Sequence, residues 1–274
     1  MNRLLRDVAP LSDAAWAAVE EEATRALTTF LAARRIVDFV GPLGWDVACV
    51  PTGHTTPIEG FADLGVRARR RRAVELVEIR TPFTLDRGVV EAIDRGADDA
   101  DLATVVQAAK QAALAEDLAV FHGTPGAQDG SGSGVAGITT TTPNDPIVLD
   151  ADFAKYPKQV AEAVTTLQEA GVAGPYALAL GTKAHVGVIE TTENGGYPLL
   201  KHLRSILGGP IVWARAVEGA IVISQRGGDI ELVSGGDFAV GYSSHDADTV
   251  QLYLEESFAV RINTPEAAVA LVHS

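Results

Sequence analysis

The six histidines are the first residues to consider for metal chemistry. They stand at positions 54, 122, 185, 202, 245 and 273. Zinc sites commonly place two histidines four residues apart, or combine histidines with closely spaced cysteines. Neither arrangement occurs in this sequence, whose single cysteine is Cys49. The spacing therefore predicts no metal site.

Two short runs contain the residue types of a hydrolase. Ser243-Ser244-His245-Asp246 holds all three members of a catalytic triad, but triad residues normally come from separated segments so that their side chains converge. Consecutive residues are more typical of a turn. Glu116 and Asp117 are adjacent carboxylates, and adjacent positions of a helix point about 100° apart. Neither run predicts a catalytic site, and we predict that the protein is not an enzyme.

A glycine-rich segment at residues 124–146 has the composition of a loop and includes the run Thr139 to Thr142. A phosphate-binding loop would end in Gly-Lys-Ser or Gly-Lys-Thr, which is absent here. The sequence also lacks a Gly-x-Ser-x-Gly elbow and a dinucleotide-binding motif that follows a predicted strand. We therefore interpret the segment as a connection without chemistry of its own.

The principal structural element is predicted within residues 12–45, as an amphipathic helix that leads into the turn Gly41-Pro42-Leu43-Gly44-Trp45. Ser12 is suited to cap its first amides, Asp13 to its positive end, and Arg34 and Arg35 to its negative end. A stripe of apolar residues recurs every three or four positions, which requires one buried face. The stripe consists of Trp16, Val19, Ala23, Leu27, Phe30 and Leu31.

The remaining pattern predicts an α+β fold. Residues 46–85 contain short β-type stretches and turn signals, which favours a long two-stranded arm. Helical periodicity predicts a short helix at 86–95, a long helix from about 102 to 122 ended by Gly123, and further helices at 156–170, 183–189 and 197–207. Strands are predicted at 176–180, 211–213, 220–224, 230–233, 249–254 and 258–262.

Composition limits the possible functions. The chain has 274 residues, a formal net charge of −14, 47% hydrophobic and 21% charged residues, which is typical of a globular protein of one or two domains. The negative charge disfavours nucleic-acid binding. No apolar run approaches the roughly 18 to 20 residues that span a bilayer, so we expect no membrane association and a cytoplasmic location. A single Cys49 fits a reducing compartment and is predicted to be a small buried hydrophobe.

Five arginines interrupt this acidic composition at Arg67 and Arg69, Arg70, Arg71 and Arg72. A basic cluster of this kind can bind nucleic acid. It can also form a solvated face or contact an acidic neighbouring subunit, and the net charge favours these two alternatives.

The order of several motifs resembles the encapsulin shell proteins. The chain contains Leu11-Ser12-Asp13-Ala14-Ala15-Trp16, Arg34-Arg35-Ile36-Val37-Asp38, Gly41-Pro42-Leu43-Gly44-Trp45 and Phe83-Thr84-Leu85-Asp86. Later come Arg95-Gly96-Ala97, Glu116-Asp117, Phe121-His122-Gly123, Gly196-Tyr197-Pro198-Leu199, Arg226-Gly227-Gly228-Asp229, Gly241-Tyr242 and Asn263-Thr264-Pro265-Glu266-Ala267. Each motif is weak alone, and the resemblance lies in the ordered set, which covers essentially the whole chain.

The resemblance implies an HK97 phage capsid-like fold. It divides the chain into an N-terminal helix and entry to a peripheral domain (1–45), an extended E-loop (46–85), a peripheral domain with a spine helix (86–149), an axial domain (150–224) and return strands of the peripheral domain (225–274). The five arginines near the arm tip are then expected to contact an adjacent subunit, since a two-stranded arm is marginally stable alone.

The function implied by the resemblance is containment. Encapsulins assemble into closed icosahedral shells in the cytoplasm and enclose a cargo enzyme, such as a dye-decolourising peroxidase or a ferritin-like protein, through its C-terminal targeting peptide. The resemblance places peptide binding on the inner wall, and we expect Trp16 and Val19 to pack internally while Phe30 and Leu31 face cargo. The implied peptide-binding residues are Phe30, Leu31, Arg34, Ile36, Asp38 and Asp229.

Two further features follow from the resemblance. The polar tip Glu190, Thr191, Thr192, Glu193 and Asn194 is expected at a five-fold pore, where Glu190 or Glu193 would form a ring that favours cations; a plain surface turn remains the alternative. Some relatives bind flavin through an aromatic residue at the position occupied here by Gly88, so we predict no cofactor.

Other protein classes remain as alternatives. A major capsid protein of an HK97-like phage would share the fold, but such proteins usually carry an N-terminal scaffolding segment before the helix. A bacteriocin or protease function has less support, because no catalytic motif is present.

Overall fold

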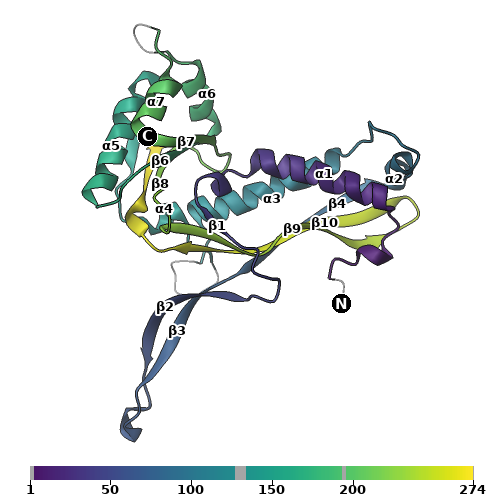
Figure 1. The fold of residues 1–274 in the computed structure, drawn as a ribbon, viewed down its shortest axis with the longest axis horizontal. Helices are drawn as coiled ribbons and strands as arrows, with labels where there is room; N and C mark the ends of the chain where they lie inside the picture. Colours follow the sequence, from purple (N-terminus) through teal and green to yellow (C-terminus); the bar gives the residue numbers. More distant parts are fainter. Residues whose placement is uncertain (1–2, 127–133, 193–195, 274) are drawn as a thin grey trace.

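The computed structural model describes residues 3–126, 134–192 and 196–273. They form a long four-stranded sheet covered by two long helices, a second sheet surrounded by shorter helices, and a two-stranded arm that projects away from both (Figure 1). This arrangement is an α+β fold.

The four-stranded sheet has the order β1-β9-β10-β4, with β1 parallel to β9 and the other pairs antiparallel. β9 and β10 are much longer than the predicted short strands. Glycines at 235 and 236 and the charged pair Glu255-Glu256 interrupt the apolar alternation, and the β9–β10 register shifts at the same places. The strands are β1 (Asp38–Val40), β4 (Val77–Asp86), β9 (Ile230–His245) and β10 (Thr249–Ile262).

Two long helices, α1 (Asp13–Phe30) and α3 (Ala103–His122), cover this sheet, with α2 (Arg87–Asp94) at one end (Figure 1). The side chain of Ser12 accepts a hydrogen bond from the Ala15 amide at 3.1 Å, which confirms the predicted N-cap. α1 ends at Phe30, and Arg34 and Arg35 lie beyond it in a 3₁₀ turn. The prediction that they complement the end of this helix was therefore wrong.

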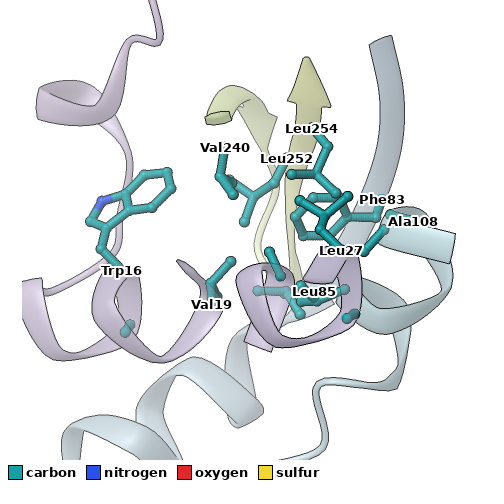
Figure 2. Packing of buried hydrophobic residues seen from close by; sticks show 14 of the residues in the cluster. Trp16, Val19, Leu27, Phe83, Leu85, Ala108, Val240, Leu252 and Leu254 are labelled. Atoms are coloured by element: carbon teal, nitrogen blue, oxygen red, sulfur yellow. The ribbon is translucent and has the colours of Figure 1, made fainter. Parts of the chain in front are cut away.

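The core between α1, α3 and the sheet is built from aliphatic and aromatic side chains. Figure 2 shows Trp16, Val19 and Leu27 of α1 facing the strands. The predicted internal packing of Trp16 and Val19 is confirmed, since Val19 is fully buried. The strands contribute Phe83, Leu85, Val240, Leu252 and Leu254, and α3 contributes small side chains such as Ala108.

The second sheet has five strands in the order β5-β11-β8-β6-β7. Its apolar strand β6 is buried along its whole length, which explains the uninterrupted run Tyr176 to Leu180. The last strand, β11, pairs with β5 and β8 in this sheet, whereas the resemblance groups all of 225–274 as return strands of the peripheral domain. The strands are β5 (Ile147–Leu149), β6 (Tyr176–Leu180), β7 (Gly208–Trp213), β8 (Ala220–Ser224) and β11 (Ala268–His273).

Three helices pack around the five-stranded sheet at α5 (Tyr156–Glu169), α6 (Thr182–Glu190) and α7 (Leu199–Leu207). They bury a separate cluster that includes Tyr156, Leu167 and Leu203. A one-turn helix, α4 (Ile138–Thr141), follows the glycine-rich connection. None of the described helices is long and apolar enough to cross a membrane.

The arm consists of β2 (Cys49–Ile58) and β3 (Ala68–Glu75), which among the described strands pair only with each other, in an antiparallel ribbon. The next strand, β4, already belongs to the four-stranded sheet, so the ribbon ends about ten residues before the C-terminal bound of the expected arm, 46–85. Cys49 is exposed at the base of the ribbon, and its prediction as a buried residue was wrong.

A matched pair of leucines tests the assignment of the main core. Leu254 is 2% exposed, whereas Leu118 on the outer side of α3 is 41% exposed. We expect Leu254→Ala to lower the free energy of unfolding by about 2–5 kcal/mol, because it removes buried surface and leaves a cavity. Leu118→Ala should cost less than about 1 kcal/mol. Denaturant titration of both variants in the same assembly state measures the difference, and equal losses would contradict the core assignment.

Candidate functional site

The segment from the end of α1 to the first residue of β1, residues 31–38, carries four of the six residues predicted to bind a peptide. Folding separates these residues into different environments. Ile36 and Asp38 line a pocket, Arg34 joins a buried ionic cluster, and Leu31 is 8% exposed within the main core. The expectation that Leu31 faces a partner is contradicted within this chain, because its side chain packs with α1 and α3.

The pocket has a volume of about 200 Å³ and lies where segment 31–38 meets the turn between β8 and β9. The structure brings Ile36 and Asp38 together with Asp229, nearly two hundred residues later in the chain. Gln225 fixes the two walls relative to each other, since its side-chain amide donates to the Ile36 carbonyl at 3.1 Å. The remaining lining residues are Val37, Ser224, Gly227 and Ile230.

The two carboxylates of the pocket have different partners. Arg226 donates to both oxygens of Asp229, at 2.9 and 2.8 Å. Although burial opposes it, this bidentate pair contributes to a lowered pKa for Asp229, so the carboxylate stays ionised. Asp38 accepts from the Gly228 amide at 2.5 Å and has no cationic partner among the described residues. The pocket therefore favours a neutral or positively charged group over an anion.

Arg34 occupies the second environment, a buried ionic cluster that joins three elements. It bonds to Glu116 of α3 at 2.6 and 2.8 Å, to Asp237 of β9 at 2.8 Å, and to Glu256 of β10. Glu116 and Glu256 are fully buried, and Asp237 is 43% exposed at its side chain. Burial alone would lower the pKa of Arg34, but these carboxylates outweigh it and raise the pKa. Removing one partner would leave a buried charge uncompensated.

The side chain of Asp117 holds the backbone of segment 31–38. Its carboxylate accepts from the Ala33 amide at 2.8 Å and from the Ala32 amide at 3.1 Å. These bonds satisfy amides beyond the end of α1 and turn the chain toward β1. Burial raises the pKa of Asp117 to about 7, against the opposing effect of the two amides. Glu116 and Asp117 therefore hold segment 31–38 in place, and neither lies in a catalytic arrangement.

Phe30 lies in a third environment at the surface end of α1. Its ring is partly exposed and contacts Trp213 edge to face, with ring centroids 6.1 Å apart. Lys110 and Arg215 lie over the ring at 5.2 and 5.3 Å. Phe30 is thus available to an outside partner, unlike Leu31.

The predicted arm and pore residues lie on the surface. The five arginines at 67 and 69–72 are exposed and form no ion pair with any described residue. Glu190 ends α6 and is exposed, and Thr192 forms an isolated bridge with Pro198. Glu193 and Asn194 fall outside the described residues. Within the described ranges, no group of three or more His, Cys, Asp or Glu residues is arranged to hold a metal ion.

Several residues of these environments were not found from the sequence. Glu256 and Asp237 complete the Arg34 cluster, and Gln225 and Arg226 organise the pocket. The charged pair Glu255-Glu256 within an otherwise apolar strand was an available signal, because a strand buried on one face must pair a charge there.

Comparison with known proteins identifies the family. The model of a family described as "encapsulating protein for peroxidase" matches residues 1–259. The chain is 48% identical to the type 1 encapsulin shell protein of Rhodospirillum rubrum, over 99% of this chain and 96% of that protein. This chain belongs to the type 1 encapsulin shell proteins. It is also 40% identical to the corresponding shell protein of Mycobacterium tuberculosis, over the full length of both.

Solved structures place this encapsulin in the HK97-like capsid fold. A virus-like particle from Pyrococcus furiosus superimposes with a TM-score of 0.61 at 16% identity and covers 94% of this chain and 99% of its own. The capsid of Myoviridae phage XM1 superimposes with a TM-score of 0.55 at 9% identity, and the match covers 87% of this chain and 90% of the phage chain. The predicted fold is confirmed. This encapsulin is a structural subunit that self-associates into capsid-like assemblies, and it is not an enzyme.

The role of Asp117 as an anchor can be tested by truncation. Asp117→Ala leaves the Ala32 and Ala33 amides without an acceptor, and we expect it to lower the free energy of unfolding by about 2–4 kcal/mol, because each buried unpaired amide costs about 1–3 kcal/mol. Asp99→Ala, at an exposed position before α3, serves as the matched control and should change little. Denaturant titration measures both, and equal effects would show that the amide bonds do not stabilise the segment.

Proposed function

We propose that this chain forms a closed shell in the cytoplasm and retains a cargo enzyme by binding a short peptide tail of that enzyme. The family description, which names a peroxidase, favours a dye-decolourising peroxidase, and a ferritin-like protein is the second candidate. We further propose that the shell binds no flavin at the position of Gly88. Its amide donates to the Asp86 side chain at 2.6 Å as part of the α2 cap, and it offers no aromatic ring.

The pocket beside segment 31–38 is the observation that carries this proposal. Ile36, Asp38 and Asp229, which the encapsulin resemblance implies as peptide-binding residues, line one concavity although they are far apart in the sequence. Leu31 and Arg34 are mostly buried within the chain and would act by holding the segment from the inside, while Phe30 offers a partly exposed apolar contact nearby on the chain.

The size of the pocket determines how a tail would bind. A volume of about 200 Å³ accommodates the side chain of one or two residues, and the rest of the tail would lie across the surface. One apolar anchor contributes roughly 1.5–3 kcal/mol, and ordering a flexible tail offsets part of it. Binding per site would therefore be weak, and an oligomeric cargo would be retained by avidity across many identical sites.

The arm supports assembly from identical subunits. Its ribbon pairs with no other described strand of the chain, and its tip exposes Phe61, Leu64 and Val66 to 42%, 75% and 51%. Apolar side chains so exposed need a neighbour to cover them. We propose that this neighbour is an adjacent subunit whose acidic surface also pairs with the arm arginines.

The phage capsid alternative shares this fold but has weaker support. The capsid structures are related at 9–16% identity, whereas the encapsulin shell proteins are related at 40–48% over nearly the full chain. Electron microscopy of the purified protein tests the shell directly. Uniform small icosahedra are expected, and dispersed monomers would contradict the proposal.

Filling the pocket tests peptide binding. Val37 lines the pocket and is only partly buried, so Val37→Phe should occupy it without touching an ion pair. We expect normal shells that co-purify with at least about tenfold less co-expressed cargo, because the loss of even one anchor is multiplied across many sites. Val8→Phe, at a 65% exposed position, is the control and should load normally. The ratio of cargo to shell protein measures loading, and full loading of Val37→Phe would show that the pocket is not the docking site.

Neutralising part of the arm tests its role in assembly. We expect Arg70→Gln combined with Arg72→Gln to reduce the assembled fraction, and the wild type to show the same loss as salt rises from about 0.1 M to about 1 M, where the Debye length falls from about 10 Å to about 3 Å. The control, Arg25→Gln combined with Arg95→Gln, removes two arginines that each pair with a glutamate three or four residues earlier in the chain. Sedimentation measures the assembled fraction. If both double variants assemble like the wild type, the arm arginines do not contact acidic residues of a neighbouring subunit.

A further inference from the structure

The Arg34 cluster contains more buried negative charge than its guanidinium balances. Glu116 and Glu256 are both fully buried, and both bond to Arg34. Asp237 is the third carboxylate but is half-exposed, so water screens it. If Glu116 and Glu256 were both ionised, two buried anions would share one cation. Like charges in such a position cannot both ionise without a large cost.

One oxygen of the cluster has no partner among the described groups. Glu256 bonds to Arg34 through Oε1, but its Oε2 is buried and makes no hydrogen bond with any of them. Glu116 and Glu256 meet at a single atom, because both accept a hydrogen bond from Nη2 of Arg34. A proton carried by Glu256 would turn one of the two buried anions into a neutral carboxyl and remove the excess charge. On Oε2 it would also neutralise the oxygen that has no described partner.

Within the described ranges, no other charge compensates the pair from the surrounding elements. Asp117 of α3 is turned toward the Ala32 and Ala33 amides. On β4, Ile79 is the cross-strand neighbour of Glu256. The next charged group along β10, Glu255, lies on the opposite face of the strand, where it pairs with Arg3 and Arg80.

We propose that Glu116 and Glu256 share one proton in the folded protein, and that this proton keeps Arg34 and segment 31–38 in the position that shapes the docking pocket. Glu256 is then a positioning residue, because it acts on the pocket through Arg34. The consequence for the pocket rests on the proposed function, whereas the shared proton does not.

The direction of the pH dependence follows from the burial of the pair. Burial raises the pKa of Glu256 to about 10, and Glu116 adds to the rise. A group whose pKa is raised by folding stabilises the protein fully below its ordinary pKa, here 4.5, and this contribution is lost as the pH rises to about 10. One proton lost in this range changes the unfolding equilibrium by about tenfold per pH unit. The contacts of Arg34 with Glu116 and Glu256 should therefore hold at neutral pH and loosen in alkali.

Chemical modification of arginines in assembled shells measures the accessibility of Arg34, and it needs no cargo. Phenylglyoxal reacts with accessible guanidinium groups, and the exposed Arg35 beside Arg34 is an internal reference for the reagent's own pH dependence. We expect the Arg34 to Arg35 modification ratio, read by mass spectrometry, to stay low near neutral pH and to rise at least about tenfold above the raised pKa of Glu256.

Glu256→Gln separates the shared proton from general alkaline unfolding. Its side-chain amide is neutral at every pH, so the variant should keep Arg34 unreactive in alkali. It should also lose the infrared carbonyl band of a protonated carboxyl that the wild type shows at about pH 9, between the raised pKa of Asp117 (about 7) and that of Glu256 (about 10). Glu91→Gln, at an exposed position, should behave like the wild type. The proposal would be overturned by a wild type without that band. It would also be overturned if the Arg34 to Arg35 modification ratio rose in alkali as much in Glu256→Gln as in the wild type. Failure of the docking pocket itself would appear separately, as full cargo loading of Val37→Phe.

Discussion

The structure depends on one buried guanidinium. Arg34 sits where the end of α1, the spine helix α3 and the two long strands β9 and β10 meet, and it bonds to a carboxylate from each of the last three. A charge in this position is tolerated only while it is paired and hydrogen-bonded. The ion pairs therefore fix the relative positions of the helix layer and the sheet more narrowly than apolar packing alone, because their geometry is directional.

This constraint also positions the candidate docking pocket. Between α1 and β1 the chain forms only one 3₁₀ turn, and segment 31–38 is held by the ion pairs of Arg34, by the two amides bonded to Asp117, and by the Gln225 bond to the Ile36 carbonyl. A pocket wall built this way is preorganised by buried contacts behind it. Preorganisation lowers the entropy cost of binding a flexible tail.

The single chain is an incomplete unit. The arm packs on the rest of the chain only at its base, where Val50 contacts Val233 and Ala259, and among the described strands its ribbon pairs with no other. The apolar residues at the arm tip are exposed. Both features agree with a family of shell proteins and with structural relatives that are capsids and virus-like particles. Self-association thus offers cover for apolar surface that the single chain leaves exposed.

Local sequence determined the elements whose signals are local. The Ser12 cap, the apolar stripe of α1 and the uninterrupted apolar run of β6 follow from helix and strand periodicity, and the ordered motifs identified the family and its fold. The tertiary structure decided the roles of neighbouring residues. Leu31 is buried because it packs in the core between α1, α3 and the sheet, whereas Phe30 is partly exposed beside Trp213. Arg34 is an internal anchor because Glu116 and Glu256 reach it from distant segments. Such long-range pairings leave no periodic pattern in the sequence, so only the folded chain reveals them.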